Sequence, residues 1–365
     1  MKLFVSILLF SSQLFAQAAT DSKLRSRGNS FNPDIGINTL FLYQNSNRGN
    51  DANVESPNGL AVQEAELQFS ADVDPYWRFI STFALHQEYD DSVTPPAREW
   101  VFEPEEAFAE SMDLPFVTVK VGKFKTAFGK HNTLHTHAFP FVDAPLANQY
   151  LLGDEGLNDV GLSASALLPT SWFSEFTVQG ISGRAEGLDY FGSNAANSTV
   201  MVGHFKNLWD LSDTLTFELG LSGASGKNID EEKTNLAGAD VTFKWRKNES
   251  TALIWSTEFL QRKQTRTDFK ENAEGFASWI QYQFARRWWL QVRGEELTFK
   301  EQDPAALEPL PEKQKKQSIL VGYIPSEFSG IRLQYDQLND GATDDEKRVL
   351  LQFNYSIGAH PAHAY

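Results

Sequence analysis

The amino-acid sequence predicts an all-β protein, a transmembrane antiparallel β-barrel of about 16 strands, and three features of the chain support this prediction. Apolar and polar residues alternate with a period of two in segment after segment, which is typical of strands with one oily and one wet face. The connections between these segments are short and long in turn. Tryptophans gather beside the short connections, where amphipathic rings fit the boundary between water and lipid headgroups.

The first residues have the pattern of a secretory signal. Lys2 precedes an apolar run over residues 3–10, and Ala16-Gln17-Ala18 resembles a cleavage site. We therefore divide the chain into a signal peptide (1–18), a periplasmic lead-in (19–33), the barrel (34–357) and a C-terminal tail with histidines (358–365). The apolar run is shorter than the ~20 residues that a spanning helix needs, so membrane residence is expected to rest on strands.

Sixteen segments show the alternation. In "AELQFSADV", Leu67 and Phe69 share one face while Glu66 and Gln68 share the other. The segments are expected at residues 34–44, 60–73, 77–88, 101–112, 115–125, 157–168, 172–182, 199–208, 214–224, 235–245, 250–261, 275–285, 287–297, 315–324, 328–337 and 347–357. One face is apolar and the other polar throughout, and an open sheet edge in hydrocarbon costs several kcal/mol for each unpaired amide, so the sheet is expected to close.

The connections give the barrel its orientation. Short turns at 73–76, 112–115, 168–172, 210–213, 246–249, 284–288 and 324–328 alternate with long polar stretches. Transmembrane barrels have tight periplasmic turns and longer outer loops. The tryptophans that flank the short turns support this assignment over a secreted β-sandwich, which has no reason to collect them on one rim: Trp77, Trp172, Trp209, Trp245, Trp288 and Trp289.

Composition narrows the function further. The formal charge is −16, from 48 acidic and 32 basic residues, which disfavours nucleic-acid binding. The chain has no cysteine, so it has neither a disulfide framework nor a thiolate metal site.

The polar face is expected to line a water-filled lumen, because sixteen strands enclose more space than side chains fill. Charges of both signs on it would sort solutes by charge and size, although each one alone could simply solvate the lumen. They are Glu64, Glu66, Arg78, Glu88, Glu106, Glu110, Lys120, Asp240, Lys244, Glu258, Arg293, Glu295, Arg332 and Asp336.

The longest connection, residues 126–156, is expected to fold inward as a constriction. It carries Phe128, Phe139 and Phe141 and is too apolar to extend into water. Three basic residues would then also line the pore and give its narrowest part positive charge: Lys123, Lys125 and Lys130.

The same connection contains "KHNTLHTHAF". His131, His135 and His137 are spaced so that a pair shares a face in either a helix or a strand, and the tail adds His360 and His363. Zinc takes three or four N, S or O ligands, and Asp143 or Asp154 could complete a set. A metal site and a polar constriction without metal both remain open.

No spacing fixes a nucleophile beside a base, and no glycine-rich phosphate loop or HExxH is present in the sequence. We therefore expect no enzymatic activity and no required cofactor, with zinc as the one optional ligand. A hydrolase on the barrel rim is the alternative from a different class.

At "VGKFKTAFG", which follows "EEAFAE", the chain resembles the phosphate-selective O and P type porins, with Ala127 where proline is common. It is more broadly similar to Gram-negative outer-membrane proteins that share "FNPDIG", "EAELQFSADVDPYW", "FGKHNTLHTHAFPFVDAPL" and "GAHPAHAY". Such proteins are often labelled zinc-regulated receptors. This resemblance implies a link to zinc and adds weight to the five histidines.

The expected function is an outer-membrane porin of a Gram-negative bacterium, which passes small hydrophilic solutes or ions by passive diffusion. The alternative within the barrel is zinc binding or uptake through the histidine loop. Expected partners are outer-membrane lipid and the solutes, and a homotrimer is an open possibility.

Overall fold

The computed structural model describes residues 33–358, apart from 49–57, 91–96, 185–186, 189, 194–197, 305–310 and 342–343. The predicted signal peptide and the tail beyond Gly358, with His360 and His363, lie outside the described residues. So does all of the predicted lead-in except Pro33.

Sixteen strands form the fold, as the alternating pattern predicts. They are β1 (Asp34–Ser46), β2 (Gly59–Asp72), β3 (Trp77–Asp90), β4 (Ala97–Ser111), β5 (Val117–Lys125), β6 (Asn158–Leu167), β7 (Phe173–Ile181), β8 (Val200–Ser212), β9 (Leu215–Lys227), β10 (Lys233–Asn248), β11 (Thr251–Thr265), β12 (Lys270–Ala285), β13 (Trp288–Glu301), β14 (Lys313–Ser326), β15 (Ser329–Asn339) and β16 (Glu346–Gly358). Each predicted segment corresponds to one strand.

The sheet closes into a barrel in which every strand pairs antiparallel with its neighbours in sequence. Closure joins β1 to β16, from Gly36 opposite Gly358 to Ser46 opposite Arg348. The closed antiparallel barrel predicted from the sequence is confirmed, and the sheet has no free edge that would expose unpaired amides to lipid.

The outward face is apolar, and aromatic rings run across it near the short turns. Trp172 stacks on Trp209 with ring centroids 5.9 Å apart, Trp209 on Phe217 at 5.3 Å, and Phe217 packs on Phe243 at 4.6 Å. Outward side chains such as Ile319 and Leu333 are about half exposed. This belt is what a wall surrounded by lipid requires.

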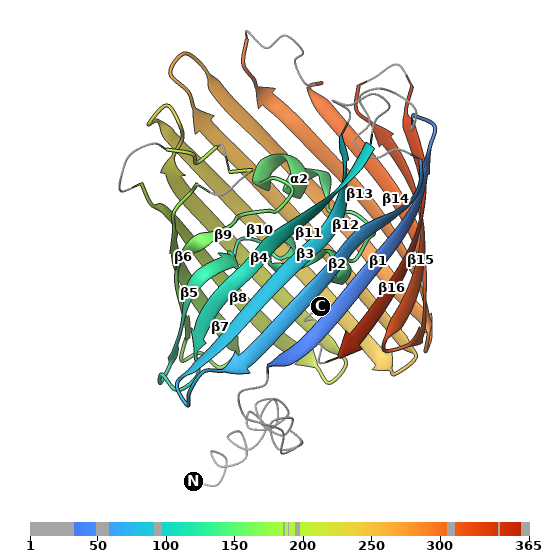
Figure 1. The fold of residues 1–365 in the computed structure, drawn as a ribbon, viewed down its shortest axis with the longest axis horizontal. Helices are drawn as coiled ribbons and strands as arrows, with labels where there is room; N and C mark the ends of the chain where they lie inside the picture. Colours follow the sequence, from blue (N-terminus) through green and yellow to red (C-terminus); the bar gives the residue numbers. More distant parts are fainter. Residues whose placement is uncertain are drawn as a thin grey trace.

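The connection between β5 and β6 folds into the barrel, where Figure 1 shows its helix α2 within the ring of strands. It contains the short 3-10 helices η1 (His131–Thr133) and η2 (Thr136–Ala138) and the helix α2 (Leu146–Leu152). No helix among the described residues has the length and apolar character needed to span a membrane.

The expectation of a polar inward face throughout is wrong for one side of the barrel. Inward side chains of β8 to β13, among them Val202, Leu236, Leu260 and Leu297, belong to a buried apolar cluster. They are apolar because loop 126–156 packs on them through Phe128 and the leucines of α2, and Leu188 and Phe191 of the β7–β8 connection join them. Part of the lumen is therefore filled by protein.

Candidate functional site

Loop 126–156 is bonded to inward side chains around most of the barrel. Its backbone amides donate to Gln179 on β7 (from Ala127, 2.8 Å), Ser222 on β9 (from Gly129, 2.8 Å) and Glu295 on β13 (from Leu146, 2.6 Å). On β2, the side chain of Gln63 donates to the carbonyl of Val142 at 3.0 Å. The polar inward residues thus hold the loop across the lumen.

Asp143 is the main electrostatic anchor of the loop. Its Oδ1 accepts a hydrogen bond from Arg293 at 2.6 Å, and its Oδ2 accepts from Lys316 at 2.9 Å and Arg348 at 3.0 Å. Burial alone would favour the neutral acid, but these three cations hold the pKa of Asp143 well below its usual value. Arg293 also lies over the ring of Phe141, 4.3 Å from its centroid.

A second anchor lies where the loop begins. Nζ of Lys130 contacts Glu218 at 2.9 Å and Thr242 at 3.0 Å, while the amides of Lys130 and His131 both donate to Glu258 at 3.2 Å. Gly129 precedes them with φ +67°, and a Cβ there would lie 1.9 Å from Oε1 of Glu258. The close approach of the loop to this carboxylate therefore requires glycine.

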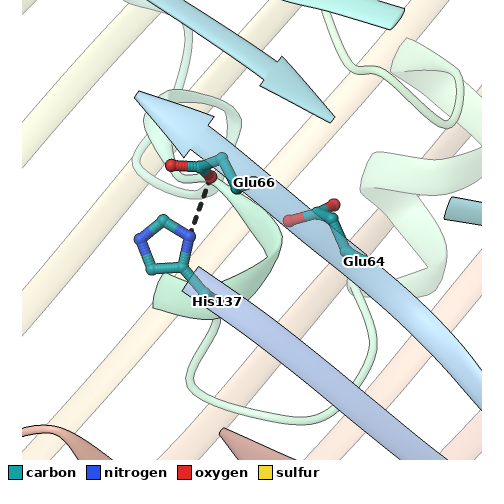
Figure 2. A group of neighbouring side chains, drawn as sticks. All are labelled: Glu64, Glu66 and His137. Atoms are coloured by element: carbon teal, nitrogen blue, oxygen red, sulfur yellow. Dashed lines mark ion pairs between the residues drawn. The ribbon is translucent and has the colours of Figure 1, made fainter. Parts of the chain in front are cut away.

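The third contact is a cluster of histidines and carboxylates. Nδ1 of His137 lies 2.9 Å from Oε2 of Glu66, and Nδ1 of His135 lies 3.5 Å from the same oxygen. His135 also contacts Glu105 at 3.1 Å through Nδ1 and Glu106 at 3.0 Å through Nε2. Figure 2 shows Glu64 and Glu66 on β2 beside His137 of η2.

Two β-bulges place the acids of this cluster. The pairing of β3 with β4 shifts between Thr82 and Phe83, so that Glu105 is an extra residue and points inward with Glu106. The pairing of β1 with β2 shifts in the same way at Gln63, next to Glu64. Strict alternation places Glu105 on the outward face, so the pattern alone does not reveal it, although Pro104 within the strand is a signal of a bulge.

The loop histidines have different electrostatic surroundings. Burial disfavours a charged imidazole, yet the hydrogen bonds to Glu105 and Glu106 raise the pKa of His135 well above its usual value. His131 packs on the ring of Phe139, with centroids 4.3 Å apart. Burial, together with nearby cations such as Arg293, lowers the pKa of His131 to about 3.

Most of the predicted pore-lining residues lie on the inward face in ionic pairs. Arg78 pairs with Asp72 at 2.8 Å and Lys120 with Glu110 at 3.1 Å, and Nζ of Lys125 lies 3.9 Å from Glu105. The inward set also includes Glu64, Glu66, Glu106, Lys130, Arg293 and Arg332. Two cations that the alternation pattern did not single out join them, the buried Lys316 and the half-buried Arg348.

Lys123 does not lie on the predicted face of its strand. It lies opposite Ala107 and Val160, which belong to the outward row of their strands, and its Nζ donates to the carbonyl of Pro104 at 2.7 Å. The prediction that Lys123 lines the pore is wrong, because strand alternation places Lys123 on the face opposite to its neighbour Phe124, which is buried inside the barrel.

The structure brings only some of the predicted metal ligands together. His135 and His137 lie in two groups that could hold a cation, Glu66 with Glu105 and His135, and Glu64 with Glu66 and His137. His131 is in neither group, and Asp143 is engaged with Arg293, Lys316 and Arg348 instead. The assignment of His131 as a ligand stays a prediction, as does that of His360 and His363, which lie outside the described residues.

A cavity of about 370 Å³ lies between the loop and the short turns. Its lining includes His137 from the loop, two tryptophans and three arginines: Trp279, Trp289, Arg286, Arg287 and Arg332. The histidine cluster therefore borders an open compartment of the barrel.

No family model matches the chain. The chain is 27% identical, over 360 residues, to an uncharacterized protein of Aquifex aeolicus, with 89% of this chain and 74% of that protein covered.

Solved outer-membrane barrels share the fold. OprB of Pseudomonas putida has a TM-score of 0.62 at 10% identity, covering 93% of this chain and 97% of its own. The outer membrane channel DcaP of Acinetobacter baumannii has 0.55 at 11%, covering 89% and 96%. OmpT of Vibrio cholerae, in a trimer form, has 0.56 at 8%, covering 89% and 99%. The chain therefore has a porin-like barrel. Because the identities are only 8–11%, this likeness concerns the fold alone.

Proposed function

We propose that the protein is an outer-membrane channel through which small hydrophilic solutes or ions diffuse passively. The observation that carries the proposal is a closed barrel with an apolar outer wall, crossed inside by a loop that is fixed to the wall through buried charges. A loop held in this way narrows the passage, and diffusion through a pore depends on the width and charge of its narrowest part.

Charge separation within the lumen supports selectivity. Loop 126–156 contacts the acids of β2 and β4 through His135 and His137, and the cations of β13, β14 and β16 through Asp143. Charges of both signs beside a narrow passage sort solutes by charge. DcaP of Acinetobacter baumannii is an outer membrane channel with the same fold, which agrees with this proposal.

Conductance in a planar lipid bilayer tests the proposal. The purified, folded protein is expected to insert with stable current steps that are ohmic at low voltage. The reversal potential in a salt gradient reports the preferred ion sign. A folded preparation that inserts into lipid but gives no steps would contradict the proposal.

The finer expectations stay predictions. These are residence in the outer membrane, a homotrimer, the absence of enzymatic activity, and membership of the phosphate-selective or zinc-regulated groups. The trimer form of OmpT, which has the same fold, makes the homotrimer the first oligomeric state to test, by the mass of the protein in detergent.

A further inference from the structure

We infer that Glu64, Glu66 and His137 form a binding site for one divalent transition-metal cation of the zinc class, which fastens loop 126–156 to β2. The three side chains are buried, and their nearest ligand atoms lie within 4.8 Å of one another. The inference goes beyond the channel function and does not depend on it.

The distances suit a small cation. Zinc lies about 2.0–2.2 Å from nitrogen and oxygen ligands, so that two ligands of a tetrahedral ion are roughly 3.3 Å apart. Nδ1 of His137 and Oε2 of Glu66 are separated by 2.9 Å, and small movements of the side chains would bring Glu64 to the same spacing. Mixed imidazole and carboxylate ligands, with no thiolate in the chain, suit zinc and its neighbours in the first transition row.

Glu64 gives an independent indication of a ligand. It is 8% exposed, and no hydrogen-bond donor among the described residues reaches its Oε1. A buried carboxylate oxygen without a donor is costly, and a cation beside it would remove that cost.

The charge of the cluster also leaves room for a cation. Four carboxylates gather here, Glu64, Glu66, Glu105 and Glu106. In the described part of the chain, the ion pairs to them come from Lys125, His135 and His137. A divalent ion would balance the acids and would join a residue of the loop to residues of the wall.

The site has an entry path, which a metal site requires. His137 lines the cavity of about 370 Å³ that extends toward the short turns, so a hydrated ion has a compartment next to one of the three ligands. With three protein ligands, the remaining coordination position would face this compartment and take water.

Zinc binding to the full-length protein in detergent tests the inference, by calorimetry after removal of metals with a chelator. His360 and His363 are first replaced by alanine, so that the tail cannot contribute. In this background we expect one zinc per chain, and a rise in unfolding temperature as zinc exceeds its dissociation constant. His137→Ala and Glu64→Gln should each weaken binding at least about tenfold, the scale seen even for loss of an outer-shell partner.

His204→Ala is the matched control. His204 is a buried inward histidine on β8 that contacts Ser222 at 2.8 Å and belongs to neither group, so its loss should leave zinc affinity unchanged. X-ray absorption of zinc bound to the background protein should show only nitrogen and oxygen neighbours, including imidazole, and this readout does not depend on a variant folding.

Absence of stoichiometric zinc in the folded background protein would overturn the inference, as would equal affinity in the His137→Ala and Glu64→Gln variants. Its failure is distinguishable from failure of the channel proposal. A protein that conducts without binding zinc contradicts only the metal site, and one that binds zinc without conducting contradicts only the channel.

Discussion

Asp143→Asn tests how loop 126–156 is held. The substitution keeps the size of the side chain but removes the charge that Arg293, Lys316 and Arg348 share. Arg293 and Lys316 are each 1% exposed at the side chain, so their charges cannot be resolvated by water without movement of the loop.

The expected loss can be scaled from these contacts. Removing one partner of a buried ion pair typically costs about 3–5 kcal/mol. Each cation keeps a second carboxylate, because Glu295 lies 2.8 Å from Arg293 and 3.3 Å from Lys316, and Asp336 lies 3.1 Å from Arg348. We therefore expect a loss of unfolding free energy near the lower end, about 3 kcal/mol.

Two assays read this change. Denaturant unfolding of the folded barrel gives the free energy, and single-channel recording should show larger or noisier steps and a reversal potential displaced toward anions. Asp154→Asn is the control, since it removes the same charge from an exposed position of the same loop. If Asp143→Asn matches Asp154→Asn in stability and conductance, the anchor does not exist as described.

Three further predictions concern the start of the loop. Gly129→Ala should destabilise the barrel by more than about 1 kcal/mol in denaturant unfolding, because of its positive φ and the carboxylate of Glu258, whereas Gly203→Ala, with open space around it, should not. The folded pKa of His131 lies at about 3, below its unfolded value of about 6.5, so the unfolded chain binds the extra proton and wild-type stability should fall as pH drops from about 6.5 toward 3. His131→Gln should flatten that part of the stability profile, and an unchanged slope would count against a buried neutral imidazole. Lys130→Gln should move the reversal potential toward cations, because it removes a cation from an acidic part of the wall, and an unchanged potential would mean that permeating ions do not sense this position.

The strands could be predicted because their signal is local. In β14, Ile319 and Val321 face outward while Ser318 and Leu320 face inward, and this alternation continues along the whole element. The turns could be predicted equally well, because short polar connections interrupt the alternation. That loop 126–156 folds into the barrel could also be predicted, because its apolar side chains would be unfavourable in water.

The contacts within the lumen could not be predicted, because they join residues far apart in sequence. Nothing near Asp143 indicates that Arg348 would reach it, 205 positions away. A bulge likewise reverses the facing of the residues around it, which is why Glu105 was missed while Glu106 was found. Leucines on the inward side of β10 and β11 can be explained only by the apolar cluster that they form with Phe128, α2 and the β7–β8 connection.

The most direct test of the central claim, that loop 126–156 lies in the permeation path, is chemical modification of Thr133→Cys during single-channel recording. Thr133 is an exposed residue of the loop, and the chain has no other cysteine to react. A charged methanethiosulfonate reagent is expected to reduce the conductance in discrete steps, while Val321→Cys, on the outward face, shows no change. Full conductance after complete modification, confirmed by mass spectrometry, would contradict the account.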